Sequence, residues 1–264
     1  MTNTPPPGAL LDLAGIALAA GREIMAVYVS DFATRTKSDL TPVTEADEAA
    51  EGIILADLTK YDPETPIVSE EAASAGRIPE VAHRFYLVDP LDGTKEFINR
   101  NGEFTVNIGL IENGRPAAGL VYAPALHRMF VGQMGKGAWQ AEIAPDADAD
   151  AALWQPIHTR ERPVSGLTVV ASRSHCDAKT EQWLKARGVK NFKPAGSSLK
   201  FCLLASGEAD LYPRFGPTME WDTAAGHAIL IAAGGKVCRE DGSPLAYGKY
   251  GENFRNPSFI ATAA

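Results

Sequence analysis

The stretch LVDPLDGTKEF, residues 87–97, places two acids, a proline and a glycine directly after an apolar pair. Strands disfavour Asp, Pro and Gly, and helix interiors disfavour Pro and Gly. We therefore expect a buried strand that runs through the apolar pair and is ended by Pro90, whose ring fixes φ. The turn that follows would present Asp89 and Asp92 close together at the end of the strand.

A second acidic strand end lies earlier in the chain, where VSEE, residues 68–71, closes on Glu70 and Glu71. Acids brought together in an interior repel one another, and their pKa values rise. Bound divalent cations relieve that repulsion, and Mg²⁺ prefers carboxylate oxygens, water and substrate phosphate. The two strand ends together therefore indicate a magnesium site, although a lone Asp-x-x-Asp is more often a solvated turn or a helix cap.

The residues after Asp92 suit a phosphate group. Gly93 allows the backbone to approach a ligand closely, and Thr94 can begin a helix whose free N–H groups favour an anion. Metals, free amides and a hydroxyl at one turn are typical of phosphoryl transfer to water.

The bulk properties limit the classes of function. The chain has 264 residues and a formal net charge of -8, with a pI of about 5.2. This balance argues against a nucleic-acid polymer as partner, because such binding needs a cationic surface. No stretch is long and apolar enough to span a bilayer. The three cysteines are dispersed and form no CxxC pair, so we expect reduced thiols and a cytoplasmic location.

The hydrophobic patterns divide the chain into two parts. Residues 1–9 are predicted to be a disordered lead, residues 10–150 an α+β part that carries the metal site, and residues 151–264 an α/β part. In the first part, Thr44 is the expected N-cap of a helix, with Asp47 completing a capping box. The expected elements of this part are helices over 10–28 and 44–60, strands over 65–72 and 84–90, a hairpin over 105–124 and further strand over 127–140.

The second part alternates strands with helices. An Ala/Asp-rich stretch, residues 141–156, is predicted to be a surface loop between the two parts. The last predicted helix begins at Asp222 and ends at a Gly-Gly pair. The expected elements are strands over 167–172 and 211–215, and helices over 179–188, 198–209 and 221–235.

Three ordered segments carry a family resemblance: VSEE, LVDPLDGTKEFINRNGEFTVNIGLI and WDTAAGHAILIAAGG. They resemble the signatures of the inositol monophosphatase-like, Li⁺-sensitive, Mg²⁺-dependent phosphatases. The resemblance implies a layered αβαβα sandwich. DGTKEF, SRSH, GSSLKFC and YPRFGPT are similar to the bacterial 3'(2'),5'-bisphosphate nucleotidases in particular, because inositol phosphatases usually carry DGTTNF.

The resemblance also implies roles for individual residues. Two to three Mg²⁺ ions would share acidic ligands and one backbone carbonyl: Glu70, Asp89, Leu91, Asp92 and Asp222. Asp47 would lie near a third, weaker ion. Thr94, together with Glu70, would orient the attacking water, and the amides of Gly93 and Thr94 would meet the scissile phosphate.

A nucleoside bisphosphate also needs contacts for its second phosphate. Hydroxyls, free amides and cations suit that anion. Candidate contacts are Lys95, His175, Ser197, Lys200 and Arg214. Asp222 is predicted to bind substrate as well as metal.

The function implied is hydrolysis of adenosine 3',5'-bisphosphate to AMP and phosphate, linked to sulfate assimilation. Two alternatives stay open: an inositol or sugar phosphatase of the same fold, and a non-catalytic metal-dependent nucleotide-binding subunit. Homodimer formation, and peripheral association with the cytoplasmic face of the inner membrane, are also left open by the sequence.

Overall fold

The computed structural model describes residues 5–31, 34–36, 42–164, 166–171, 178–187, 189 and 191–263. Its larger sheet has seven strands in the order β3-β4-β5-β6-β7-β8-β9. β3 runs parallel to β4, and every later neighbour pairs antiparallel. The strands are β3 (Ile67–Ser69), β4 (Arg84–Asp92), β5 (Thr105–Glu112), β6 (Arg115–Ala123), β7 (Arg128–Gln133), β8 (Gly137–Glu142) and β9 (Gln155–Ile157).

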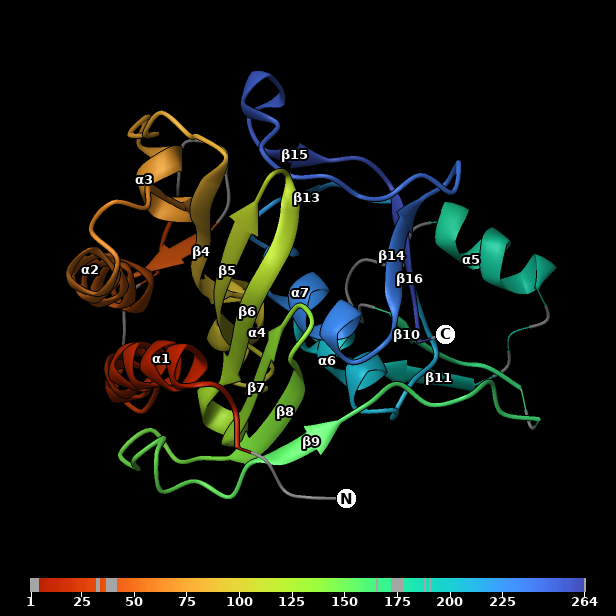
Figure 1. Cartoon of the computed structure of the whole chain (residues 1–264), viewed down its shortest axis with the longest axis horizontal. Helices are drawn as coiled ribbons and strands as arrows, with labels where there is room; N and C mark the ends of the chain where they lie inside the picture. Colours follow the sequence, from red (N-terminus) through yellow and green to blue (C-terminus); the bar gives the residue numbers. More distant parts are fainter. Residues whose placement is uncertain are drawn as a thin grey trace.

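Two long helices cover one face of this sheet, α1 (Gly8–Tyr28) and α2 (Glu45–Tyr61) (Figure 1). Side chains alternate between the two faces of a strand, so one strand can contribute residues to the hydrophobic core on each face of the sheet. In β4, Tyr86 and Val88 pack with the α1–α2 cluster, whereas Phe85 and Leu87 pack on the opposite side. Strand β4 is therefore buried on both faces, and this packing fixes the position of its acidic end.

A second sheet of five strands has the order β11-β10-β12-β16-β14. Helices α6 (Leu199–Ala205) and α7 (Ala224–Ala232) lie between the two sheets, and α5 (Ala178–Ala186) covers the outer face (Figure 1). The five layers confirm the predicted αβαβα sandwich. The strands of this sheet are β10 (Thr168–Ala171), β11 (Asn191–Pro194), β12 (Leu211–Arg214), β14 (Lys236–Arg239) and β16 (Phe259–Thr262).

Short elements complete the fold around these layers. They are β1 (Thr34–Thr36), β2 (Pro42–Thr44), α3 (Glu70–Ser74), α4 (Thr94–Ile98), η1 (Pro124–Leu126), β13 (Thr218–Met219), η2 (Tyr250–Glu252) and β15 (Arg255–Asn256). Within the described residues, no helix has the length and apolar character needed to cross a membrane.

Helix α7 lies unusually close to the seven-stranded sheet because glycines face it. A Cβ built on Gly109 would lie 2.7 Å from Ala224 Cβ, and one on Gly132 would lie 2.7 Å from Ile229 Cα. At Gly119 it would collide with the carbonyl oxygen of Ala225. Three adjacent strands thus each present a glycine, without a side chain, to α7. The close packing that this allows determines where the start of α7 lies.

Several predictions of local structure are confirmed. Thr44 caps α2 in a capping box with Asp47. Asn113 and Gly114 both have positive φ in the β5–β6 turn, as an Asn-Gly hairpin requires. The helix predicted over 10–28 begins two residues earlier, at Gly8. The division into two parts at residue 150 stays a prediction, and β9 pairs with β8 just beyond that boundary.

Several predictions about helix and strand ends are wrong. The strand predicted over 65–72 covers only Ile67–Ser69, because Glu70 begins helix α3. Pro90 does not end β4, because the strand continues to Asp92 through a register shift between Asp89 and Asp92. This irregularity accommodates a proline that has no N–H for the ladder. Helix α7 does not begin at Asp222: its N-cap is Thr223, and Asp222 lies in the preceding turn.

The predicted surface loop 141–156 and the C-terminal region also differ from expectation. Ile143, Ala149 and Trp154 are buried in the α1–α2 cluster, so the stretch is anchored although it is irregular. Strands β11, β14 and β16 were not predicted from the sequence.

Candidate active site

The irregular end of β4 forms the first wall of the site. Asp89 is 2% exposed, and its Oδ1 accepts a hydrogen bond of 3.0 Å from the backbone N–H of Leu91. Gly93 follows in the left-handed region, with φ 94°, and caps the short helix α4. A side chain at Gly93 would also collide with Ser197 Oγ. The glycine is therefore required by both the turn and the close approach of the second half of the chain.

Asp92 joins the two halves of the site. Its Oδ2 lies 3.3 Å from Asn107 Nδ2 and 3.1 Å from Ser198 Oγ. The same hydroxyl of Ser198 lies 2.6 Å from the backbone oxygen of Asp222. Ser197 Oγ lies 2.7 Å from the backbone oxygen of Asp92. The two serines before α6 thus connect the β4 turn with the turn that carries Asp222.

Asp222 lies in the turn between β13 and α7. Its Oδ2 accepts a hydrogen bond of 2.8 Å from the backbone N–H of Met219, three residues earlier. The carboxylate is therefore bound by its own turn rather than by the first turn of α7. The close contact between α7 and the sheet then brings this turn to the end of β4.

The capping box at the start of α2 reaches the same region. Asp47 Oδ2 accepts hydrogen bonds from the N–H and the hydroxyl of Thr44, at 2.8 and 2.7 Å. Its other oxygen, Oδ1, accepts from Thr94 Oγ1 at 3.3 Å. Asp47 therefore orients the hydroxyl of Thr94, whose proton points toward the Asp47 carboxylate.

These segments enclose one cavity of about 290 Å³. All but two of the predicted site residues line it: Glu70, Asp89, Leu91, Asp92, Gly93, Thr94, Lys95, Ser197, Lys200, Arg214 and Asp222. Asp47 reaches it only through Thr94, and His175 lies outside the described residues. The sequence did not suggest Glu96, Phe201, Tyr212, Thr218 and Thr223, which also line it. Of these, Thr218 and Thr223 flank Asp222 closely enough that its neighbourhood could have indicated them.

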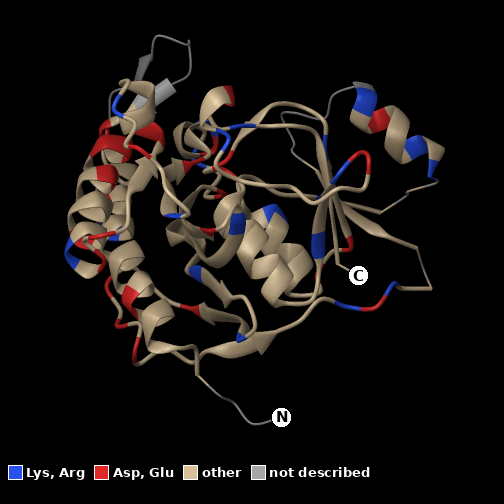
Figure 2. Ribbon diagram, turned by 45° about the horizontal axis from the view of Figure 1, so that its top comes forward, with Lys and Arg blue, Asp and Glu red and all other residues tan. Residues whose placement is uncertain are grey.

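The cavity is lined by both acidic and basic side chains. Burial and the neighbouring charge of Glu70 raise the pKa of Asp89 well above its usual range, and burial with Asp92 does the same for Asp222. Burial also raises the pKa of Asp92, although Lys200 opposes that shift. Burial lowers the pKa of Lys200 to about 8. Acids also occupy the first turns of α2 and α3, and Figure 2 shows acidic residues gathered on that side of the molecule.

The donor set fits hard cations such as Mg²⁺. Three carboxylates that raise one another's pKa share the cavity with the backbone of Leu91, and oxygen donors of this kind suit Mg²⁺. In the described part of the chain, however, no three His, Cys, Asp or Glu side chains already form a metal-binding group. In each of Asp89, Asp92 and Asp222, one carboxylate oxygen accepts a hydrogen bond from a backbone N–H or a neighbouring side chain.

Comparisons with known proteins agree with this arrangement. The model of the inositol monophosphatase family matches residues 10–263. The chain is 46% identical to the 3'(2'),5'-bisphosphate nucleotidase CysQ of Escherichia coli (strain K12), over 92% of this chain and 95% of that protein. It is 47% identical to the protein of the same name from Salmonella typhimurium, over 94% of this chain and 96% of that one.

A solved structure has the same fold. CysQ from Bacteroides thetaiotaomicron, described as a bacterial member of the inositol monophosphatase family, superposes with a TM-score of 0.81 at 37% identity, covering 97% of both chains. Together with the cavity, these likenesses define a phosphatase with a layered α+β fold. The chain belongs to the inositol monophosphatase family.

Proposed function

We propose that this chain is a Mg²⁺-dependent 3'(2'),5'-bisphosphate nucleotidase that removes the 3'-phosphate of adenosine 3',5'-bisphosphate to give AMP and phosphate. The observation that carries the proposal is that one cavity is lined both by a group of buried carboxylates and by the cations Lys200 and Arg214. A substrate with two phosphates has one group for metal ions held by the carboxylates and another for the cations. The names of the relatives at 46–47% identity support the same substrate class.

In this proposal, two to three Mg²⁺ ions would be held by Glu70, Asp89, the Leu91 carbonyl, Asp92 and Asp222, with Asp47 near the weakest ion. Bound Mg²⁺ would make water a better nucleophile and offset the charge on the reacting phosphate. The protein's own part is to position these groups. It keeps the acids dry and close together, so a cation is the partner that relieves their repulsion.

Thr94 is proposed to orient the attacking water together with Glu70. Its hydroxyl donates to Asp47, so the lone pairs of Thr94 Oγ1 stay available to accept a hydrogen bond from that water. The backbone amides of Gly93 and Thr94 face a phosphate at the start of α4, and Lys95 follows them along the cavity wall. This arrangement orients water and phosphate before reaction.

The second phosphate is proposed to bind Lys200, Arg214 and Ser197. Lys200 is 6% exposed, and its Nζ lies 3.4 Å from the backbone oxygen of Ala195. Arg214 donates from one terminal nitrogen to Pro217, and its buried Nε has no hydrogen-bond partner within the described residues. Cations with unused donors suit an anion. A contact from His175 stays a prediction, because that residue lies outside the described residues.

The test is a phosphate-release assay with adenosine 3',5'-bisphosphate and inositol 1-phosphate side by side, with Mg²⁺ and with a chelator. We expect Mg²⁺-dependent release and a clear preference for the nucleotide. Equal or faster release from inositol phosphate would overturn the proposal in favour of an inositol or sugar phosphatase. Binding of the nucleotide without release from either compound would indicate a non-catalytic subunit.

The link to sulfate assimilation rests on the family resemblance and belongs to the same proposal. Cytoplasmic location, association with the membrane face and homodimer formation stay predictions from the sequence.

A further inference from the structure

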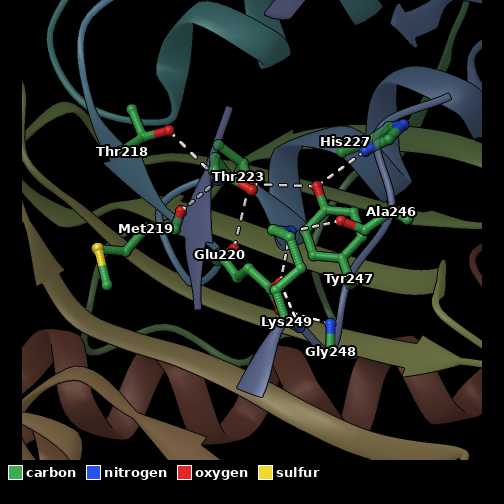
Figure 3. A network of polar contacts seen from close by, with 10 residues as sticks. Thr218, Met219, Glu220, Thr223, His227, Ala246, Tyr247, Gly248 and Lys249 are labelled. Carbon is green, nitrogen blue, oxygen red and sulfur yellow. Dashed lines mark hydrogen bonds and ion pairs between the residues drawn. The ribbon is translucent and has the colours of Figure 1, made fainter. Parts of the chain in front are cut away.

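A network of polar contacts includes residues on both sides of Asp222 in the sequence, among them Met219, Glu220 and Thr223 (Figure 3). Its centre is Glu220, which is 0% exposed and lies two residues before Asp222. Among the described residues that line the cavity, Glu220 does not appear. A fully buried charge that contacts neither the cavity nor solvent carries a desolvation penalty, so its partners are informative about its role.

Glu220 binds a segment far away in sequence, residues 246–256, which we call the strap. Its Oε2 accepts the N–H of Gly248 at 2.8 Å, and its Oε1 accepts the N–H of Lys249 at 2.9 Å. The ammonium of Lys249 lies 2.5 Å from the same Oε1. The backbone N–H of Glu220 donates in turn to the carbonyl of Phe254 at 2.8 Å. Glu220 therefore fastens the turn to the strap through both its side chain and its backbone.

Asn256, at the end of the strap, fastens the other side of the turn. Its Nδ2 donates to the carbonyl of Met219 at 2.7 Å and lies 3.0 Å from Thr223 Oγ1. Met219 is the residue whose N–H holds the carboxylate of Asp222. Met219, three residues before Asp222, and Thr223, directly after it, are thus connected to one strap side chain.

A chain of hydroxyl groups continues the network into α7. Thr223 donates to the carbonyl of Glu220, and Tyr247 donates to Thr223, at 3.2 Å each. Tyr247 then accepts from Nδ1 of His227 at 2.8 Å. This assignment of the His227 tautomer follows from the other bonds of the network. Every link of the chain then has one donor and one acceptor.

We infer that Glu220 is a positioning residue for Asp222: by fastening the turn 219–222 to the strap, it sets the direction in which the Asp222 carboxylate faces the cavity. The inference rests on the proposed role of Asp222 as a metal ligand. Partners that orient a ligand commonly change metal affinity by about 10- to 100-fold when they are removed.

The experiment compares Glu220→Gln with Asp222→Asn and with Glu252→Gln, an exposed acid of the same strap, as matched control. Mn²⁺ is the probe, because the paramagnetic resonance signal of free Mn²⁺ reports binding without turnover. D222N is expected to lose one Mn²⁺ site. For that same site, we expect E220Q to need about tenfold more Mn²⁺ than the wild-type protein to reach half-saturation. Phosphate release by E220Q at saturating Mg²⁺ should stay within about twofold of the wild-type rate, and E252Q should match the wild-type protein throughout.

Each other outcome has a distinct meaning. If D222N binds Mn²⁺ as the wild-type protein does, Asp222 is not a ligand, and both the ligand assignment and the inference drawn from it fail. If D222N loses binding but folded E220Q binds normally, only the positioning role is overturned. If E220Q does not fold, Lys249→Met replaces it, with an expected weakening of about threefold. Wild-type Mn²⁺ binding by K249M would then overturn the inference.

Discussion

The two walls of the candidate active site are built in different ways. The first wall is a run of consecutive residues, 89–94, at the end of strand β4. The second wall is assembled from separate segments, with Ser197 and Lys200 at α6, Arg214 in β12 and Asp222 before α7. The first is shaped by hydrogen bonds between near neighbours, such as Asp89 with Leu91. The second depends on packing and on contacts across the chain, so the two walls should respond differently to substitution.

The largest effect is expected in the first wall, from Asp89→Asn. The substitution removes a charge and keeps the shape, so phosphate release should fall by about 10³-fold or more. The fold should persist, because the pKa of Asp89 is raised by burial and by Glu70, and losing one carboxylate relieves that repulsion. Phosphate release and a thermal melt without Mg²⁺ measure the two quantities.

The matched control for this variant is Asp57→Asn, an exposed-face acid on α2 that pairs with Lys60. It should leave phosphate release unchanged and alter stability by no more than about 0.5 kcal/mol. Near wild-type turnover of D89N would contradict the assignment of Asp89 as a metal ligand.

The same contrast explains which parts of the molecule could be predicted from the sequence. The first wall was predictable because its acids, glycine and threonine are adjacent in sequence and each has a local structural preference. The capping box of Thr44 and Asp47 was predictable for the same reason. What local preference missed was the continuation of β4 past Pro90, since strand pairing with β5 resumes at Thr105.

The second wall was predictable only through the family resemblance. Nothing local to Asp222 indicates that its turn is held by a strap ending at Asn256. Phe201 and Tyr212 have the composition of core residues, yet they line the cavity because their segments cross beside it. Such positions follow from tertiary packing, which has no short-range pattern in a single sequence.

The next effect tests the packing that places the second wall. Gly119→Ala would put a Cβ against the carbonyl oxygen of Ala225, at the start of α7. Backbone of this kind cannot move away easily, so we expect a loss of about 3 kcal/mol in the free energy of unfolding. Urea denaturation measures it, and Gly15→Ala is the control.

Gly15 lies in helix α1, and a Cβ there would meet nothing within 4 Å. The control should therefore be neutral or stabilising by up to about 1 kcal/mol. Wild-type stability of G119A would mean that the sheet and α7 are not tightly apposed, and the placement of Asp222 would need another cause.

A smaller and more selective effect is expected at Lys200. Lys200→Met keeps the buried stem and removes the ammonium, so a second phosphate loses a charge-assisted hydrogen bond. For adenosine 3',5'-bisphosphate, kcat/KM should fall by about 30-fold, and for 3'-AMP by less than about threefold. Lys185→Met, on the exposed face of α5, is the matched control. Equal losses with both substrates would show that Lys200 does not contact the second phosphate.

The smallest expected effect concerns the network behind the second wall, through the pH dependence of stability. Burial lowers the pKa of His227 to about 3 in the folded chain, from an ordinary value of 6.5. The folded state then binds fewer protons than the unfolded state, so this contribution is complete above pH 6.5 and is lost as pH falls toward 3. Between pH 7 and pH 5.5 the loss should be about 1 kcal/mol.

The measurement is the free energy of unfolding at these two pH values for the wild-type protein, His227→Gln and His83→Gln. Gln cannot take up the proton, so H227Q should be less stable at pH 7 but should lose about 1 kcal/mol less on acidification. H83Q, at an exposed position, should keep the wild-type dependence. An unchanged slope in H227Q would mean that His227 is protonated, or accessible to solvent, in the folded chain. The directed chain from His227 through Tyr247 to Thr223 would then be wrong, whereas the first wall would be unaffected, since none of its described contacts involve that chain.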